Sequence, residues 1–350
     1  MSDDGSDERA VLLPRETSVL FGHAEAELAL LASYQGGRIP HAWLIGGPPG
    51  IGKATLAYRL ASFVLANPDP KLPAVANAGS LALDPEHPVA RRVAAQAQGD
   101  LLVLERVINE QTGKLYTVIR VEDVRRAVPF FGSTAGEGGW RIAIVDAVDD
   151  LERPSANALL KILEEPPART LLLLISHAPG RELPTIRSRC RRLLLRPLPT
   201  ADVARSVAVA AHRNAGDADV IDAAAAADGS VGRALRFLDG PALALRQRVL
   251  DLFAQLPNPD PRALHALGDA LGGSEPQTLA SFMDMVDGWL ASQLESGAAG
   301  QNSAESPRMA RVAQAWEKIN RNARDVETYN LERKPLVFAV FGLLAEAARA

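Results

Sequence analysis

Three glycines and a lysine near the start of the chain have the spacing of a phosphate-binding loop. Residues 46–55 read GGPPGIGKAT, which places Gly47, Gly50 and Gly52 ahead of Lys53. Glycines let the backbone N–H groups turn inward around a phosphate, and the lysine ammonium can reach the outer phosphate oxygens. These residue types in this order predict a site for a nucleotide.

The elements around the loop match this interpretation. An apolar run, Ala42–Ile45, precedes the loop and predicts a strand. Leu56, Leu60 and Val64 follow it at helical spacing and predict an amphipathic helix. Strand, glycine loop and helix are therefore in the order that a phosphate loop requires. The alternative is that the loop is retained only as architecture.

Two positions that hydrolysis would use are occupied by alanine. Ala54 stands where a Ser or Thr hydroxyl would bind Mg²⁺, and the hydroxyl of Thr55 should point away because a helix turns about 100° per residue. The strand predicted at residues 141–145 ends in Asp146, a carboxylate suited to the Mg²⁺ shell, but the next position, where hydrolytic P-loop proteins carry an acid, is Ala147. The sequence thus predicts binding of ATP or ADP without hydrolysis and no metal site of its own. The residues of this site are Gly47, Gly50, Gly52, Lys53, Thr55 and Asp146.

The order of the remaining elements predicts an α/β domain followed by helices. From Leu12 to about Arg196, apolar runs alternate with amphipathic stretches, as in a mostly parallel sheet covered by helices. The expected strands are residues 42–45, 101–104, 117–121, 141–145, 171–175 and 192–195. Helices are expected near residues 201–212, 218–227, 231–238, 276–295, 307–323 and 335–349. Residues 67–99, rich in Pro, Ala and Gly, predict an irregular insertion.

Composition limits the classes of function. With 38 Lys and Arg against 42 Asp and Glu, the chain is not a polycation that coats nucleic acid, so any DNA contact must be local. The single cysteine, Cys190, excludes an internal disulfide and a cysteine-based zinc site. The acidic N-terminus has no apolar segment, and no run approaches the roughly 20 residues that span a bilayer. We therefore expect a cytoplasmic protein without membrane contact.

Three strings in the sequence resemble a known family. Residues 157–167 read NALLKILEEPP, residues 183–190 read LPTIRSRC, and residues 229–235 read GSVGRAL. They resemble the clamp-loader branch of the AAA+ family. The resemblance implies an α/β P-loop AAA+ (RecA-like) domain over residues 1–196. An all-α lid over residues 197–240 and an all-α collar, which holds an oligomer together, over residues 241–350 would follow.

The resemblance also implies a role for Arg189. In the family, the arginine of the Ser-Arg-Cys motif projects toward the ATP of a neighbouring subunit, where a planar, permanently charged guanidinium stabilises phosphoryl charge. The alternative is that Arg187, Arg189, Arg191 and Arg192 form a solvated basic edge. In motor subunits a nearby arginine senses nucleotide, but here that slot is Gly232 and the arginine is displaced to Arg233. We expect this displacement to change the helix face.

Within the branch, a phosphate loop with Ala54 and Ala147 at the hydrolytic positions, together with the Ser-Arg-Cys motif, fits a stator that cannot hydrolyse ATP. The implied partners are motor subunits and a delta subunit in a hetero-pentamer, the sliding clamp, and primed DNA reached through the complex. The four-cysteine zinc module of many family members is excluded, because residues 67–100 contain no cysteine. One rival is an active AAA+ ATPase, either a clamp-loader motor or a branch-migration machine. Another is a DNA-binding adaptor that contacts phosphate through residues such as Arg125 and Arg126.

Overall fold

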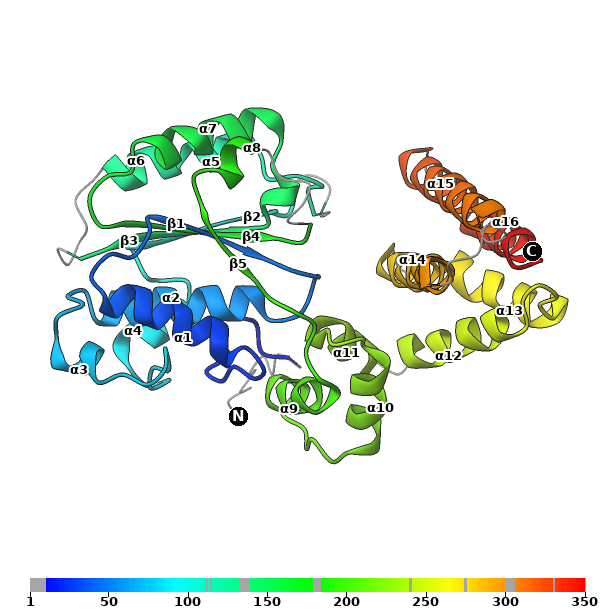
Figure 1. Ribbon diagram of the computed structural model, residues 1–350, viewed down its shortest axis with the longest axis horizontal. Coiled ribbons are helices and arrows are strands. Elements are labelled where there is room, and N and C mark those ends of the chain that lie inside the picture. Colours follow the sequence, from blue (N-terminus) through cyan, green and yellow to red (C-terminus); the bar gives the residue numbers. More distant parts are fainter. Residues whose placement is uncertain are drawn as a thin grey trace, which may run out of the picture. The chain divides into compact units, whose positions relative to one another are not determined.

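Five strands form one parallel sheet in the computed structural model (Figure 1). The structure describes residues 11–110, 113, 115–132, 139–178, 184–238, 241–273, 276–299, 306–329 and 331–349. The strands are β1 (Ala42–Gly46), β2 (Leu101–Glu105), β3 (Arg141–Asp146), β4 (Thr170–Ser176) and β5 (Arg191–Leu194). Their order is β2-β3-β4-β1-β5, so β2 and β5 are the edges. The phosphate loop leaves β1, next to the central strand β4.

Both faces of the sheet are buried by helices, which explains why the central residues of its inner strands are apolar. Trp43 and Ile45 pack on the side of α1 (Ala24–Gln35) and α2 (Lys53–Ala66). Ala42 and Leu44 pack on the opposite side. That side carries α5 (Val121–Arg125), α6 (Ala127–Gly132), α7 (Arg153–Glu164) and α8 (Pro184–Arg187), as Figure 1 shows. Alternate residues of one strand thus belong to two separate apolar clusters.

The strand predicted at residues 117–121 is wrong. Only Ile119 pairs there, in an isolated bridge with Leu151, and its N–H donates to the carbonyl of Asp150 (2.8 Å). Helix α5 begins at Val121, and the acidic side chains of Glu122 and Asp123 lie in its first turn, where they interact favourably with the helix dipole. The β-branched run is therefore interrupted by a helix start after a single paired residue.

The insertion at residues 67–99 is packed against the main domain. It contains two short helices, α3 (Pro73–Ala76) and α4 (Pro88–Ala94). The side chains of Val75, Leu81 and Val93 are at most 2% exposed and belong to the same apolar cluster as α1 and α2. Apolar contacts therefore hold this segment in place.

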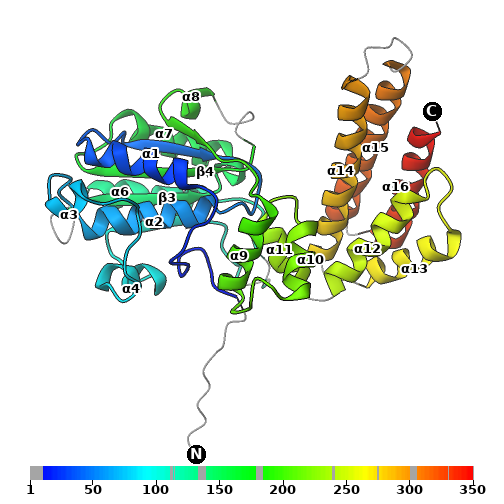
Figure 2. The same ribbon diagram turned by 60° about the horizontal axis from the view of Figure 1, so that its bottom comes forward.

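Three further helices follow β5. They are α9 (Thr200–Ala210), α10 (Ala218–Ala226) and α11 (Val231–Leu238), and they gather around one another in Figure 2. Contacts divide the chain into two compact units, Met1–Arg236 and Phe237–Ala350. The predicted boundaries of a separate lid, residues 197 and 240, stay a prediction, and Gly240 lies outside the described residues.

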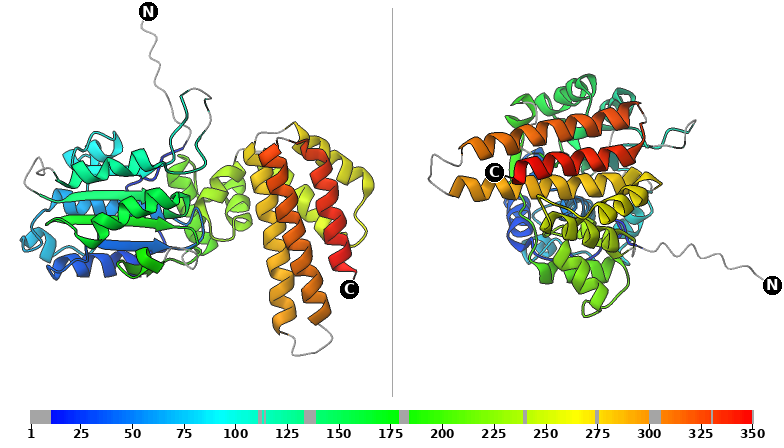
Figure 3. Two further views of the ribbon diagram at one scale, coloured as in Figure 1. Left: turned by 90° about the horizontal axis from the view of Figure 1, so that it is seen from above. Right: turned by 90° about the vertical axis from the view of Figure 1, so that its right-hand side faces the viewer.

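The second unit is helical. Its elements are α12 (Pro241–Ala254), α13 (Pro261–Gly272), α14 (Pro276–Ala299), α15 (Ser306–Tyr329) and α16 (Arg333–Ala348). Figure 3 shows α14, α15 and α16 running side by side, and Phe282 of α14 and Phe341 of α16 stack in the core with ring centroids 6.3 Å apart. In the described parts of both units, none of the helices combines the length and apolar character that crossing a membrane would require.

Candidate nucleotide site

The loop after β1 has the conformation that its glycines predict. Gly47, Gly50 and Gly52 have φ angles of 146°, 74° and 101°, in the region that side chains disfavour. A Cβ on Gly47 would lie 2.6 Å from the carbonyl oxygen of Leu195, so the loop also passes too close to its neighbour for any side chain. Helix α2 begins directly after the loop, at Lys53. Strand, loop and helix therefore form a phosphate cradle at a helix N-terminus.

The ammonium of Lys53 lies inside this loop. Its side chain is almost fully buried, and Nζ donates to the carbonyls of Gly47 and Pro48, both at 2.6 Å. Burial lowers the pKa of Lys53 to about 8, although the carboxylates of Asp146 and Asp149 oppose that change. The buried, hydrogen-bonded ammonium of Lys53 therefore lies inside the loop, in position to contact the phosphate oxygens of a bound nucleotide.

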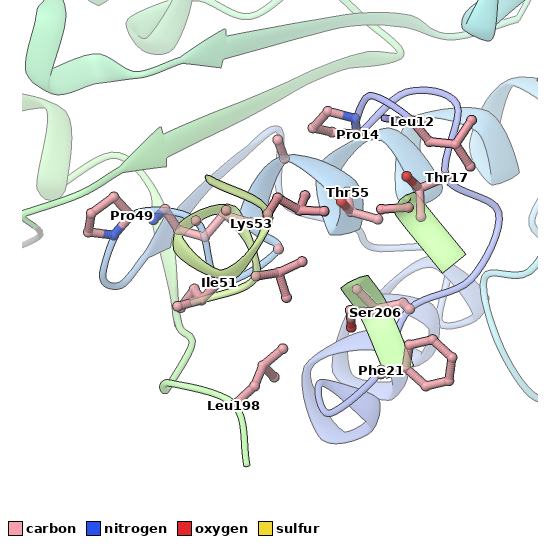
Figure 4. A pocket seen from close by; sticks show the side chains of 18 of the residues that line it. Leu12, Pro14, Thr17, Phe21, Pro49, Ile51, Lys53, Thr55, Leu198 and Ser206 are labelled. Carbon is pink, nitrogen blue, oxygen red and sulfur yellow. The ribbon is translucent and has the colours of Figure 1, made fainter. Parts of the chain in front are cut away.

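A cavity of about 320 Å³ opens beside the loop, a size at the lower end of small-molecule sites. Figure 4 shows Lys53 and Thr55 of α2, Leu12 and Phe21 of the N-terminal segment, and Leu198 around it. Most of the remaining lining is apolar, and a few polar groups lie at the loop. The further lining residues include Ile51, Ala54, Asp146, His177, Val209, Val231 and Leu235. The cavity therefore combines an apolar wall with one cation and one carboxyl group.

Of the predicted site residues, Gly50, Gly52, Lys53, Thr55 and Asp146 line this cavity together. Gly47 contributes through its carbonyl, which accepts from Lys53.

Ala54 and Ala147 occupy the two positions that hydrolysis would use. Ala54 lines the cavity, and Ala147 is 1% exposed, packed in the core on the α1 and α2 side of the sheet. Burial, followed by the nearby carboxylate of Glu105, raises the pKa of Asp146 to about 6. Glu105 is the register partner of Asp146 on β2. The methyl group of Ala147 offers no acid or base at this position.

Asp149 and His177 are site residues that sequence reasoning missed. Asp149 lies in the short turn that follows β3. Its carboxylate accepts from the backbone N–H groups of His177 (2.6 Å) and Ala178 (3.1 Å) and from the Ser176 hydroxyl (3.3 Å). These bonds tie the end of β3 to the end of β4 beside the cavity. Nothing in the local sequence signals them, because the partners lie 27 to 29 residues away.

The segment before α11 rests directly on the phosphate loop. The hydroxyl of Ser230 donates to the carbonyl of Pro49, and the N–H of Gly232 donates to the carbonyl of Gly50, both at 3.0 Å. A Cβ on Gly50 would overlap the Ser230 hydroxyl. Arg233 forms an ion pair with Asp228 (2.8 Å), while Gly232 faces the loop. The residue of α11 that contacts the loop is therefore Gly232, which has no charged side chain.

His23 completes the wall of the loop. Its side chain is 6% exposed, and Nε2 is 2.7 Å from the carbonyl oxygen of Ile51. Burial lowers the pKa of His23, so the neutral imidazole is favoured. His23 therefore supports the loop through packing and one hydrogen bond.

Arg189 lies apart from the cavity. It stands between α8 and β5 with 35% of its side chain exposed, and it is not among the residues that line the cavity. Its Nη1 donates to the carbonyl of Thr185 (2.9 Å), and its Nη2 donates to Oε1 of Glu164 (2.8 Å). Leu183, the first residue of its sequence string, lies outside the described residues. The structure thus leaves Arg189 at the surface, away from the chain's own phosphate loop.

Three other residues singled out from the sequence, Cys190, Arg125 and Arg126, have plainer surroundings. Cys190 packs against the apolar cluster on the α7 side of the sheet, and burial raises the pKa of its thiol to about 12, so the thiol stays protonated. Arg125 and Arg126 are exposed near the end of α5, and Nη2 of Arg126 pairs with Oδ1 of Asp123 at 3.1 Å.

Comparison with known proteins connects this site to a family. Residues 22–199 match the family model described as DNA polymerase III, delta subunit, which is just over half of the chain. The chain is similar to DNA polymerase III subunit delta' of Pseudomonas aeruginosa, with 41% identity over 173 residues, covering 49% of this chain and 48% of the relative. The subunit of the same name from Escherichia coli is 31% identical over 176 residues, covering 49% and 46%.

The matched region spans about half the length of these curated relatives. Among solved structures, a DNA polymerase III gamma subunit-related protein from Thermotoga maritima aligns with 91% of this chain and 99% of its own, at 14% identity and a TM-score of 0.45. The extent of the family match decides the assignment, since it contains the phosphate loop, the β3 aspartate and the Ser-Arg-Cys string. The chain belongs to the DNA polymerase III delta subunit family.

Proposed function

We propose that the chain is a stator subunit of a replicative clamp loader. In this role it helps to load the sliding clamp onto primed DNA and supplies Arg189 to the ATP site of a neighbouring subunit, but does not hydrolyse ATP itself. Support comes from the family and from the name that both relatives share. The work of such a subunit takes place in the cytoplasm, where bacterial DNA is replicated.

One observation carries the proposal: the phosphate cradle is complete while two hydrolytic positions hold methyl groups. Lys53 is buried in the loop, but Ala54 replaces a metal-binding hydroxyl and Ala147 replaces a water-activating acid. These features favour binding without turnover.

The cradle fits the phosphates of ATP or ADP. The glycine loop, the N-terminus of α2 and the ammonium of Lys53 would hold the phosphates, and the apolar wall that includes Phe21 and Leu198 would cover the rest of the nucleotide. Thr55 and Asp146 stand at the edge of the same cavity. The bound nucleotide would fix the loop rather than supply chemical work. No zinc is part of this proposal.

The arginine is proposed to act in trans. Arg189 is partly exposed and lies away from its own phosphate loop, so the phosphate group that it stabilises would come from another subunit. The proposed assembly is a hetero-pentamer with motor subunits and a delta subunit, in which the helical unit of residues 237–350 contributes to the ring. Contact with the clamp and with primed DNA would be made through this complex.

The test is the ATPase activity of the loader assembled with and without substitutions in this chain. Arg189→Ala should leave assembly intact and lower turnover by up to roughly 10³-fold, the effect of removing an arginine finger. The isolated chain should show no hydrolysis above background. Lys53→Ala, which removes the cradle cation, should weaken nucleotide binding by the isolated chain. Unchanged turnover with Arg189→Ala would refute the finger, and hydrolysis by the isolated chain that Lys53→Ala abolishes would identify a motor instead.

A further inference from the structure

Residues of two helices contact the guanidinium of Arg189. The carbonyl of Thr185 belongs to α8 and accepts from Nη1, whereas the carboxylate of Glu164 is at the end of α7 and accepts from Nη2. Helices α7 and α8 pack against each other, so both acceptors are fixed to the same rigid part of the domain. The guanidinium is therefore bound by one backbone carbonyl and one carboxylate from neighbouring helices.

This ion pair contributes little to the stability of the fold. The side chains of Arg189 and Glu164 are 35% and 50% exposed, and pairs exposed to this degree typically stabilise a protein by about 0 to 1 kcal/mol. Glu165, the next residue, is also exposed and carries the same charge. The contact thus distinguishes Glu164 from its neighbour by geometry rather than by burial or charge.

The contacts of Arg189 with Thr185 and Glu164 do not use all of its N–H donors. A guanidinium has five N–H groups, and the contacts with Thr185 and Glu164 occupy one on each terminal nitrogen. A longer contact of 3.4 Å joins Nη1 to the Ser188 hydroxyl. Among the described residues, no acceptor is bound to Nε–H or to the second N–H of Nη2, and these groups can donate to an oxyanion. Two acceptors can therefore orient the fork while it binds a phosphate oxygen.

The surrounding face of α7 is accessible to another molecule. Asn157, Lys161 and Glu164 are separated by four and three residues, so they lie on one side of the helix, and all three are exposed. The apolar side of the helix, which includes Leu159 and Leu163, is buried in the domain. The charged end of α7 and the guanidinium are thus presented together at the surface.

We propose that Glu164 is a positioning residue for the arginine finger, which holds the guanidinium of Arg189 in the direction that the phosphate of the neighbouring subunit requires. This inference rests on the proposed function, in which Arg189 acts in trans. Without the carboxylate, the long side chain would have to be ordered at each catalytic cycle, because an arginine has many accessible rotamers. Preorganisation of this kind changes the rate of the chemical step and leaves ATP binding unaltered.

The experiment measures kcat and KM for ATP with the loader assembled from full-length subunits. Glu164→Ala should lower kcat by roughly 10-fold through lost preorganisation and leave KM within about twofold. Glu164→Gln keeps an acceptor oxygen at the same place and should retain most of the rate. Glu165→Ala is the matched control and should behave like the wild type. Assembly of each variant is checked by size-exclusion chromatography.

A double-mutant cycle separates this inference from the proposed function. If Glu164 acts through Arg189, the double variant Glu164→Ala with Arg189→Ala should be no slower than Arg189→Ala alone. Additive losses, an unchanged kcat with Glu164→Ala, or an equal loss with Glu165→Ala would each overturn the positioning role while leaving the finger intact. No loss with Arg189→Ala would overturn the finger itself, and the positioning role with it.

Discussion

Replacing Asp146 by asparagine should stabilise the α/β unit above neutral pH. Asp146 is largely buried at the end of β3, opposite the like charge of Glu105, and its pKa is raised from 3.8 to about 6. At 1.36 kcal/mol for each pH unit, keeping this carboxylate ionised in the folded chain costs about 3 kcal/mol. The asparagine side chain of the variant carries no charge, so that cost disappears, and the change in shape is minimal.

The gain should depend on pH in a defined direction. The unfolded chain releases the Asp146 proton near pH 3.8, whereas the folded chain keeps it up to about pH 6, so wild-type stability falls as pH rises between these pKa values. Below that window both forms are protonated, and the variant gains little. Above it the full cost is present. Asp146→Asn should therefore be nearly neutral around pH 4 and stabilising by about 3 kcal/mol at pH 7.5.

Urea unfolding followed by tryptophan fluorescence can measure this effect in one unit. Trp43 and Trp140 lie in the α/β unit, so replacing Trp289 and Trp316 of the helical unit by Phe restricts the signal to the unit of interest. Asp222→Asn, at an exposed position on α10, controls for the loss of one negative charge. A gain of the same size at both pH values, or a loss of stability at pH 7.5, would refute the reasoning.

Two further substitutions test how the cradle and the insertion are held. Gly50→Ala should lower the free energy of unfolding by about 2 to 4 kcal/mol, because φ is 74° and the new methyl group would overlap Ser230. Urea unfolding of the α/β unit measures this loss. Glu27→Ala should lower the free energy of unfolding by about 3 kcal/mol. It removes the carboxylate that lies 2.7 Å from Nη2 of Arg59, in an ion pair whose side chains are at most 12% exposed, and it leaves the Leu81 N–H without this acceptor. Limited proteolysis should then cut the insertion faster, and unchanged cleavage would contradict this.

The sequence predicts the strands of the sheet well, because four of them are nearly continuous apolar runs that only a doubly covered sheet can bury. It does not predict the strand order, which depends on crossovers between segments far apart. Residues 117–121 were misassigned because their β-branched composition favours a strand but does not show how many of them pair with a neighbouring strand. Only Ile119 does so, in a single bridge with Leu151. The acidic pair after Val121, which starts α5, was the signal that could have corrected the prediction.

The loop residues of the candidate site could be predicted for a different reason. Gly50 and Lys53 act through local backbone geometry, which their spacing encodes. The contacts of Gly232 with the loop, of Asp149 with the end of β4, and of Glu164 with Arg189 depend on tertiary placement. Periodicity indicates only which side of a helix is buried, so it could not distinguish Glu164 from Glu165.

The exposed edge formed by β5 has a consequence for the solubility of the chain. A strand at the edge of a sheet presents unpaired backbone groups that can recruit a strand from another molecule. β5 is only four residues long and displays Arg191 and Arg192, with the guanidinium of Arg191 lying 5.1 Å from the ring of Trp43. Two chains that approached edge to edge would bring four cations together. The short, doubly charged strand therefore protects the sheet against aggregation at this edge.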